Sequence, residues 1–204
     1  MQDNLQIFLL CYIPLLVAMD PIGLLPIFLS MTSHMSESDR RRVIFHACFT
    51  ATVVAFVFMA VGKKVLDILN ITNPDFLVAG GIVLFSSAIV DLVGGEKRSR
   101  KPKPEDGIGA VPLGVPLIVG PGVMAALLLL LPKYGAFSTS IAMVCCIFTA
   151  GVVCLLAPWT LKLLRESGTR AASRIAALLL AAFAVMIIRE GLTEIIKGLA
   201  RAAK

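Results

Sequence analysis

Asp20-Pro21-Ile22-Gly23 and, about a hundred residues later, Gly120-Pro121-Gly122 interrupt two long apolar stretches of this chain. Proline removes an amide hydrogen and glycine loosens the backbone, so each stretch predicts a helix that stops and starts again. In lipid, the backbone groups that such a break frees find no water and need another partner. We therefore expect two broken membrane helices whose interruptions serve a binding site.

The composition is that of a polytopic membrane protein. Hydrophobic residues make up 58% of the 204 and charged residues only 16%, which departs strongly from soluble domains. Apolar runs long enough for a transmembrane helix recur along the chain, with short polar loops predicted between them, as at 33–42 and 165–174. The runs cover residues 5–31, 43–66, 76–94, 108–131, 139–164 and 175–196. The sequence thus predicts an all-α membrane protein with six transmembrane helices.

A charged, proline-containing stretch over residues 96–107 divides the chain near its middle. Each half holds three apolar runs, an odd number, so the second half must be inserted upside down relative to the first. Prolines recur in corresponding runs, at Pro14, Pro21 and Pro26 and again at Pro112, Pro116 and Pro121. We predict one membrane domain of two inverted three-helix repeats, 1–95 and 108–204, with helices 1 and 4 broken and a cytoplasmic linker at 96–107.

Charge indicates orientation and not a nucleic-acid partner. The formal net charge is +6, but the basic residues gather in the loops between the apolar runs, where they govern topology. If the amino terminus is outside, the cytoplasmic loops hold about twice as many Lys and Arg residues as the outer side. This bias favours both termini on the outer side of the membrane.

The first interruption has the residues of a helix start. Asp20 is a good N-cap, and Pro21 suits the first helical position because it has no amide hydrogen to leave without a partner. A new half-helix should begin at Pro21, with free amides of Ile22 and Gly23 pointing toward the middle of the bilayer. Gly23 would let a ligand approach the backbone closely.

The second interruption follows the same logic with Gly120 as cap, Pro121 in the first helical position and Gly122 offering an unshielded amide. By pseudo-symmetry the amino ends of the two half-helices converge, beside the free carbonyls that end the preceding half-helices. The predicted substrate-binding residues are Asp20, Pro21, Ile22, Gly23, Gly120, Pro121 and Gly122.

Amide groups beside carbonyl groups suit a zwitterion, because its carboxylate can take the amides while its ammonium group takes the carbonyls and Asp20. The glycines leave little room for a bulky or charged side chain, so small amino acids are the expected ligands. A carboxylate deep in a membrane is costly and is usually partnered by an ion or a substrate. Asp20 is therefore the candidate for coupling transport to H⁺ or to Na⁺.

Other polar residues carry weaker signals. Gly-x-Ser-x-Gly and His-Glu-x-x-His motifs are absent, so neither catalysis nor a cofactor is expected. The two histidines and five cysteines lack metal-ligand spacing, and no metal site is expected. Asp91, Arg189 and Glu190 lie near the ends of their runs and are interpreted as interfacial. Ser86 and Ser87 are interpreted as part of a small packing face, with a place at the cavity left open.

The stretches 19–28 and 116–122 resemble the paired motifs of the MarC family of bacterial and archaeal inner-membrane proteins, which includes the SnatA-type small neutral amino acid transporters. The resemblance extends to the length, the six spans and the central linker. It implies a multi-pass inner-membrane transporter of glycine and alanine, with inverted repeats and broken first and fourth helices around the substrate. It maps the site onto Asp20, Pro21 and Gly23 and onto residues 120–122, and an inner membrane would make both termini periplasmic.

The expected function is secondary-active transport by alternating access around a site at the bilayer midplane. An exporter of amino acids or other small solutes on the same scaffold is the alternative. A channel and an intramembrane enzyme are further alternatives from other classes. The chain has no Walker A motif, so it is not expected to power transport with ATP itself.

Overall fold

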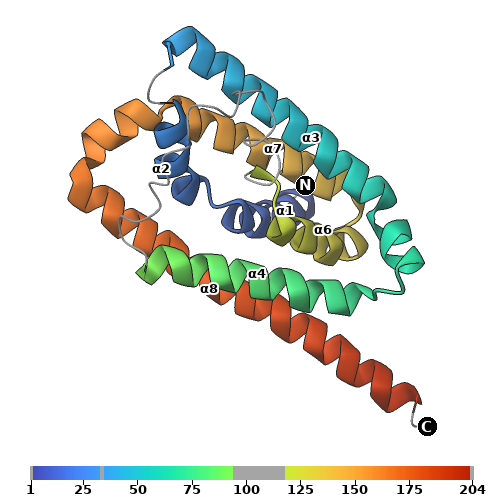
Figure 1. Cartoon of the computed structure of the whole chain (residues 1–204). Coiled ribbons are helices and arrows are strands. Elements are labelled where there is room, and N and C mark those ends of the chain that lie inside the picture. Colours follow the sequence, from blue (N-terminus) through green and yellow to red (C-terminus); the bar gives the residue numbers. More distant parts are fainter. Residues whose placement is uncertain (1, 33–34, 94–117, 203–204) are drawn as a thin grey trace.

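The computed structural model describes residues 2–32, 35–93 and 118–202, and the regular elements in these ranges are all helices (Figure 1). This agrees with the predicted all-α class. In chain order the helices are α1 (Gln2–Met19), α2 (Pro21–Thr32), α3 (Glu37–Ile68), α4 (Asn73–Val93), α6 (Pro121–Tyr134), α7 (Ala136–Leu155) and α8 (Ala157–Ala202).

Five segments of the described chain are long and apolar enough to cross a membrane. They are Asn4–Leu25, Glu37–Ile68, Asn73–Val93, Ala136–Leu155 and Ala171–Ala200. A sixth apolar helix, Pro121–Tyr134, is shorter. It belongs to the predicted fourth span, whose first residues, 108–117, lie outside the described residues together with the linker at 96–107.

The short loop predicted over residues 165–174 is wrong, because α8 is helical from Ala157 to Ala202 and curves as it passes through this stretch (Figure 1). The stretch contains no proline, and its arginines and alanines favour a helix. The boundary lies earlier, since α7 ends at Leu155 and Pro158 has no amide hydrogen to donate to the carbonyl of Cys154. The other loop, predicted over residues 33–42, ends earlier than predicted, because α3 begins at Glu37. Ser36 caps this helix by accepting a hydrogen bond from the Asp39 amide at 3.2 Å.

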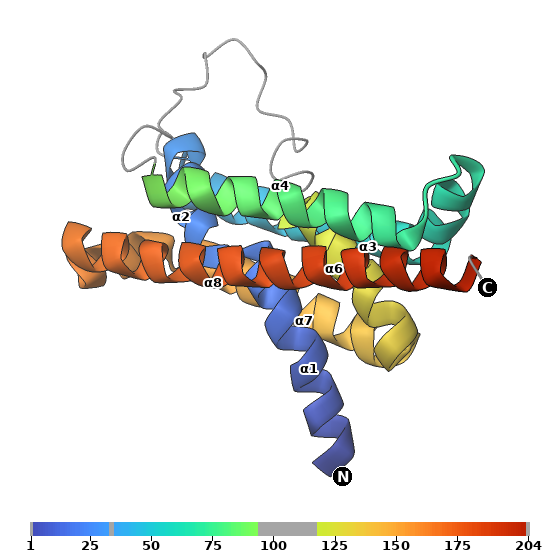
Figure 2. The same ribbon diagram turned by 90° about the horizontal axis from the view of Figure 1, so that it is seen from below.

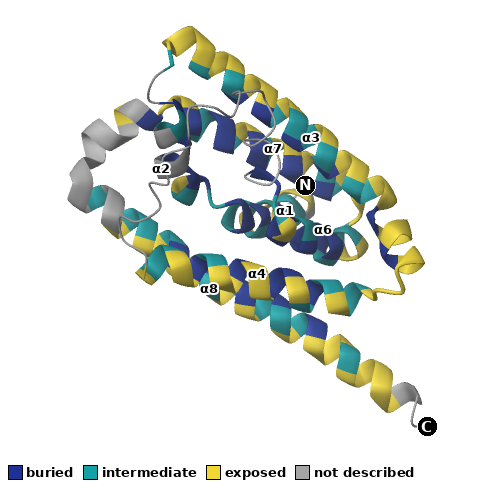
Figure 3. Ribbon diagram, viewed as in Figure 1, coloured by how far each residue is buried: buried dark blue, intermediate teal, exposed yellow. Residues whose placement is uncertain are grey.

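The buried apolar side chains form two clusters. The first, here called the α1–α7 cluster, joins α1, α2, α3, α6 and α7. The second, the α4–α8 cluster, joins α4 and α8 and includes residues of α6. Figures 1 and 2 both show α4 and α8 side by side along one flank of the molecule. The outward faces of α3 and α4 expose large apolar side chains, as a lipid-facing surface requires (Figure 3).

Small polar contacts join α1 to α7 inside the first cluster. The hydroxyls of Tyr12 and Thr149 are hydrogen-bonded at 2.8 Å, and the Cys146 thiol donates to the carbonyl oxygen of Tyr12 at 3.3 Å. Contacts of this kind across closely packed helices are typical of membrane bundles. They tie α1 to α7 on the side of the molecule away from α4.

Glycines bring α4 and α8 close together. A Cβ added at Gly81 would lie 2.5 Å from Cγ1 of Ile188, and one added at Gly191 would lie 2.8 Å from the carbonyl oxygen of Pro74. Cβ atoms in real proteins essentially never show such short contacts. Small residues at an interface let membrane helices approach each other in this way.

We expect Gly191→Ala to lower the free energy of unfolding by about 1–3 kcal/mol, because the added methyl must push α8 away from α4. The measurement is equilibrium unfolding of the purified protein in detergent. Gly198→Ala is the matched control on the same helix, since a Cβ at Gly198 would meet nothing within 4 Å. Equal losses in the two variants would contradict close α4–α8 packing at Gly191.

Candidate functional site

The first interruption consists of a single residue between two helices. α1 ends at Met19, α2 begins at Pro21, and Asp20 lies between them with a φ of 45°. Few residues other than glycine, asparagine and aspartate adopt this left-handed conformation readily. The amide of Asp20 donates to the Leu16 carbonyl at 3.1 Å, and the carbonyl of Asp20 accepts from the Leu24 amide at 3.2 Å. Asp20 therefore ends one helix and starts the next.

The carboxylate of Asp20 caps α2, as predicted. Its Oδ1 accepts a hydrogen bond from the amide of Gly23 at 3.1 Å, which is the usual bond between an N-cap side chain and the third helical residue. The Gly23 amide, predicted to be free for a ligand, is therefore engaged by this carboxylate. A Cβ at position 23 would overlap this carboxylate, so any larger residue would force the Asp20 side chain to move.

The second helix start differs in its capping. α6 begins at Pro121, preceded by Gly120 in an extended conformation with no side-chain cap. The carbonyl of Gly120 accepts from the Met124 amide at 3.1 Å. The first-turn amides, including that of Gly122, thus have no capping carboxylate of the kind that α2 has. The segment before residue 118, on which a break in the predicted fourth helix depends, lies outside the described residues.

A cavity of about 200 Å³ lies between these two helix starts. Asp20 and Gly23 line it from the first motif, and Gly120, Pro121 and Gly122 line it from the second. The two motifs lie about a hundred positions apart in the sequence. The fold therefore brings most of the predicted site residues to one place.

Pro21 and Ile22, also predicted as site residues, are not among the residues that line the cavity. Pro21 is buried elsewhere, and the Ile22 side chain is 38% exposed. Successive residues of a helix point about 100° apart, so the residues between Asp20 and Gly23 face other directions.

Two polar residues of α4 complete the cavity wall. Ser87 and Asp91 line it together with Leu84, and their spacing of three and four places all three on one face of α4. Asp91, which is interpreted as interfacial from the sequence, also borders the cavity. Of the two serines of the small packing face, Ser87 lines the cavity and Ser86 is exposed. The helical spacing of Leu84, Ser87 and Asp91 is the sequence signal that identifies this face.

The wall therefore combines two kinds of charge. The amino end of α6 carries the positive end of the helix dipole and amides that can donate to an anion. Asp20 and Asp91 offer carboxylate oxygens, which accept from an ammonium group or attract a cation. Across the described residues, this cavity included, no three His, Cys, Asp or Glu side chains are grouped so as to hold a metal ion. Chemically, the cavity suits a small molecule with one positive and one negative group.

Comparisons with known proteins agree with this membrane architecture. Residues 5–196 match the family model described as "MarC family integral membrane protein". The chain is similar to UPF0056 membrane protein YhcE of Escherichia coli (strain K12), with 29% identity over 92% of this chain and 93% of the relative. It is 32% identical to a UPF0056 membrane protein of Archaeoglobus fulgidus, over 93% of this chain and 94% of the relative. No solved structure matches the chain at a significant level. The chain belongs to the MarC family of integral membrane proteins.

Proposed function

We propose that this protein is a secondary transporter of small neutral amino acids such as glycine and alanine, with the substrate bound between the starts of α2 and α6. One observation carries the proposal: Asp20 and Gly23 border the same cavity as Gly120, Pro121 and Gly122. Backbone ends that meet at a cavity inside a membrane protein are the usual construction of a transporter site.

The charges around the cavity define the orientation of the substrate. Its carboxylate lies at the amino end of α6, where the amide of Gly122 and the helix dipole favour a negative group. Its ammonium group lies toward Asp20 and Asp91. A hydrogen bond to a charged group contributes about 1.5–3 kcal/mol, so losing either end of the zwitterion weakens binding markedly.

The remaining wall selects for a small, uncharged side chain. Leu24, Leu84, Val123 and Leu180 line the cavity between its polar groups. A charged side chain would be placed against these apolar groups without a partner, which is costly. Glycine and alanine avoid this cost because they carry no side chain beyond a hydrogen or a methyl group.

The position of the cavity between the two apolar clusters supports transport by alternating access. Leu24 and Val123 belong to the α1–α7 cluster, whereas Leu84 and Leu180 belong to the α4–α8 cluster. We infer that the α4–α8 pair moves as a unit against the rest and opens the cavity to one side and then to the other. The moving unit therefore includes one helix from each half of the sequence, because α4 and α8 come from opposite halves.

The proposal includes two inverted three-helix repeats with broken first and fourth helices, in an inner membrane with both termini in the periplasm. The interruption at Asp20 and the start of α6 at Pro121 support the two breaks. H⁺ or Na⁺ drives the transport through Asp20, and the chain has no enzymatic role.

The test is uptake of labelled glycine into proteoliposomes that contain the purified protein, under imposed pH and sodium gradients. We expect saturable, gradient-driven uptake that alanine inhibits and that lysine and glutamate leave unchanged. Preloaded unlabelled alanine should accelerate entry by counterflow, which a carrier shows and a pore does not. Absence of both uptake and binding of these amino acids, or a unitary conductance in planar bilayers, would refute the proposed function.

A further inference from the structure

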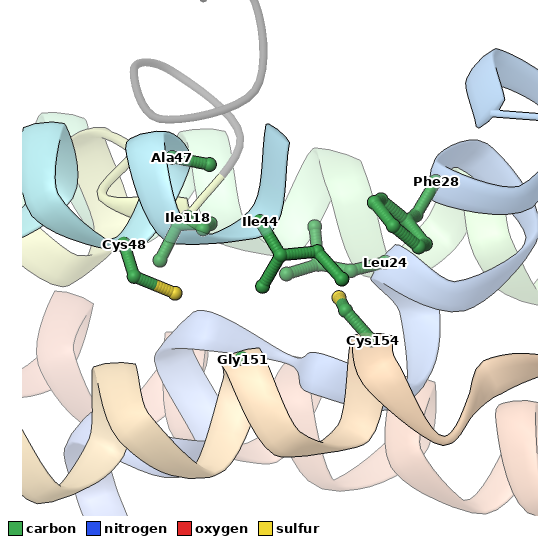
Figure 4. A pocket seen from close by; sticks show the side chains of 8 residues that line it. All are labelled: Leu24, Phe28, Ile44, Ala47, Cys48, Ile118, Gly151 and Cys154. Atoms are coloured by element: carbon green, nitrogen blue, oxygen red, sulfur yellow. The ribbon is translucent and has the colours of Figure 1, made fainter. Parts of the chain in front are cut away.

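A second, much smaller cavity lies beside the one described above. Its volume is about 20 Å³, and it lies between α2, α3 and α7. Figure 4 shows that the surrounding side chains are apolar apart from the thiols of Cys48 and Cys154, which point into the same space. The cavity is thus a small unfilled volume inside the α1–α7 cluster.

Two side chains, Leu24 and Ile118, line both cavities and so separate them. Both are almost completely buried, with exposed fractions of 7% and 6%. Leu24 follows Asp20 by one helical turn, and Ile118 stands two residues before Gly120. The backbone segments that border the larger cavity therefore also hold this partition in place.

We propose that Leu24 and Ile118 set the upper size limit for the side chain of the transported amino acid. The inference rests on the proposed function, because it assumes that the larger cavity binds an amino acid. With the ammonium and carboxylate groups held at the polar wall, the substituent on Cα is left facing the apolar wall, where these two residues stand. A hydrogen or a methyl group is accommodated, whereas a branched side chain meets the partition.

The partition is effective because protein interiors are close-packed and resist the insertion of additional carbon atoms. The volume behind the partition is too small to receive a displaced leucine side chain. Shortening Leu24 or Ile118 would join the two cavities and extend the larger one toward Cys48 and Cys154. The extended cavity would have an apolar end, which suits valine or leucine.

The experiment measures equilibrium binding of glycine, alanine, valine and leucine to the full-length purified protein and to Leu24→Ala and Ile118→Ala. A methylene group in an apolar pocket changes affinity by about 10-fold or more, so we expect valine and leucine to bind the wild type at least about tenfold more weakly than alanine. In each variant, valine and leucine should gain about tenfold in affinity, while glycine should change by less than about threefold.

Leu25→Ala is the matched control. Leu25 is the next residue of α2, is 3% exposed, and lines neither cavity. The Leu25→Ala variant therefore loses the same atoms from the same core without opening the partition. Its preference for glycine and alanine should stay as in the wild type. Uptake assays with the same four amino acids should give the same order of preference as binding.

The outcomes separate this inference from the proposed function. Failure of the wild type to bind glycine or alanine would refute the proposed function and this inference with it. If the wild type binds glycine and alanine, two results would overturn the proposed role of Leu24 and Ile118 alone. The first is that valine and leucine bind the two partition variants no more tightly than the wild type, and the second is that Leu25→Ala gains affinity for them equally. If the alanine variants do not fold, Leu24→Val and Ile118→Val replace them, because they remove fewer atoms. An unchanged preference among the four amino acids in these valine variants would likewise overturn the proposed role of Leu24 and Ile118.

Discussion

Gly23→Ala should reduce the binding of glycine by about 10- to 100-fold, equivalent to the loss of one charge-assisted hydrogen bond of about 1.5–3 kcal/mol. The added methyl group would overlap the Asp20 carboxylate, which now accepts a hydrogen bond from the Gly23 amide at 3.1 Å. The carboxylate must move, and it either leaves its capping position or enters the cavity. Either movement displaces the carboxylate from the position in which it is proposed to meet the substrate's ammonium group.

The measurement combines glycine binding with thermal unfolding in detergent, because loss of the N-cap alone costs about 1 kcal/mol of stability. Gly198→Ala again serves as the control glycine, since it lies far from any neighbour. Gly122→Ala should have a smaller effect than Gly23→Ala, because its Cβ would displace the apolar Leu84 side chain and not the carboxylate that is proposed to meet the ammonium group. Normal glycine affinity in a folded Gly23→Ala protein would contradict the proposed role of this helix start.

The helix starts could be predicted from the sequence because they depend on neighbouring residues alone. Asp20 followed by Pro21, and Gly120 followed by Pro121, have the capping and first-turn chemistry that begins a helix in any surroundings. The structure starts α2 and α6 at these two prolines. Ser36 caps α3 for the same local reason and accepts a hydrogen bond from the Asp39 amide.

The rest of the site depends on how the helices pack, and local sequence patterns do not reveal this packing. The position of Asp91 near the end of an apolar run does not reveal that the packing of α4 turns this residue toward the starts of α2 and α6. The partition of Leu24 and Ile118 could not be predicted either, because both look like ordinary core residues in an apolar run. The polar stretch 165–174, predicted as a loop, is helical in α8, because it contains no proline and its arginines and alanines favour a helix.

Asp20→Asn should lower gradient-driven uptake of glycine at least about tenfold, because it removes a charge that contributes about 1.5–3 kcal/mol through hydrogen bonding. Asparagine tolerates the φ of 45° as aspartate does, and its side-chain oxygen can still accept from the Gly23 amide. The helix start therefore remains intact. Asp20→Ala, in contrast, loses the cap as well and places alanine in a left-handed conformation at a cost of about 1–2 kcal/mol.

Uptake by Asp20→Asn is measured with a pH gradient in the absence of sodium and with a sodium gradient at equal pH. Counterflow exchange should persist more strongly than net uptake, because exchange requires no net movement of the coupling ion. Asp67→Asn, on the exposed surface of α3, controls for the loss of a negative charge.

Retained uptake by Asp20→Asn under the pH gradient would exclude Asp20 as the proton carrier. Asp91→Asn, tested in parallel, then decides the assignment, because Asp91 is the other carboxylate that the described residues place at the cavity wall.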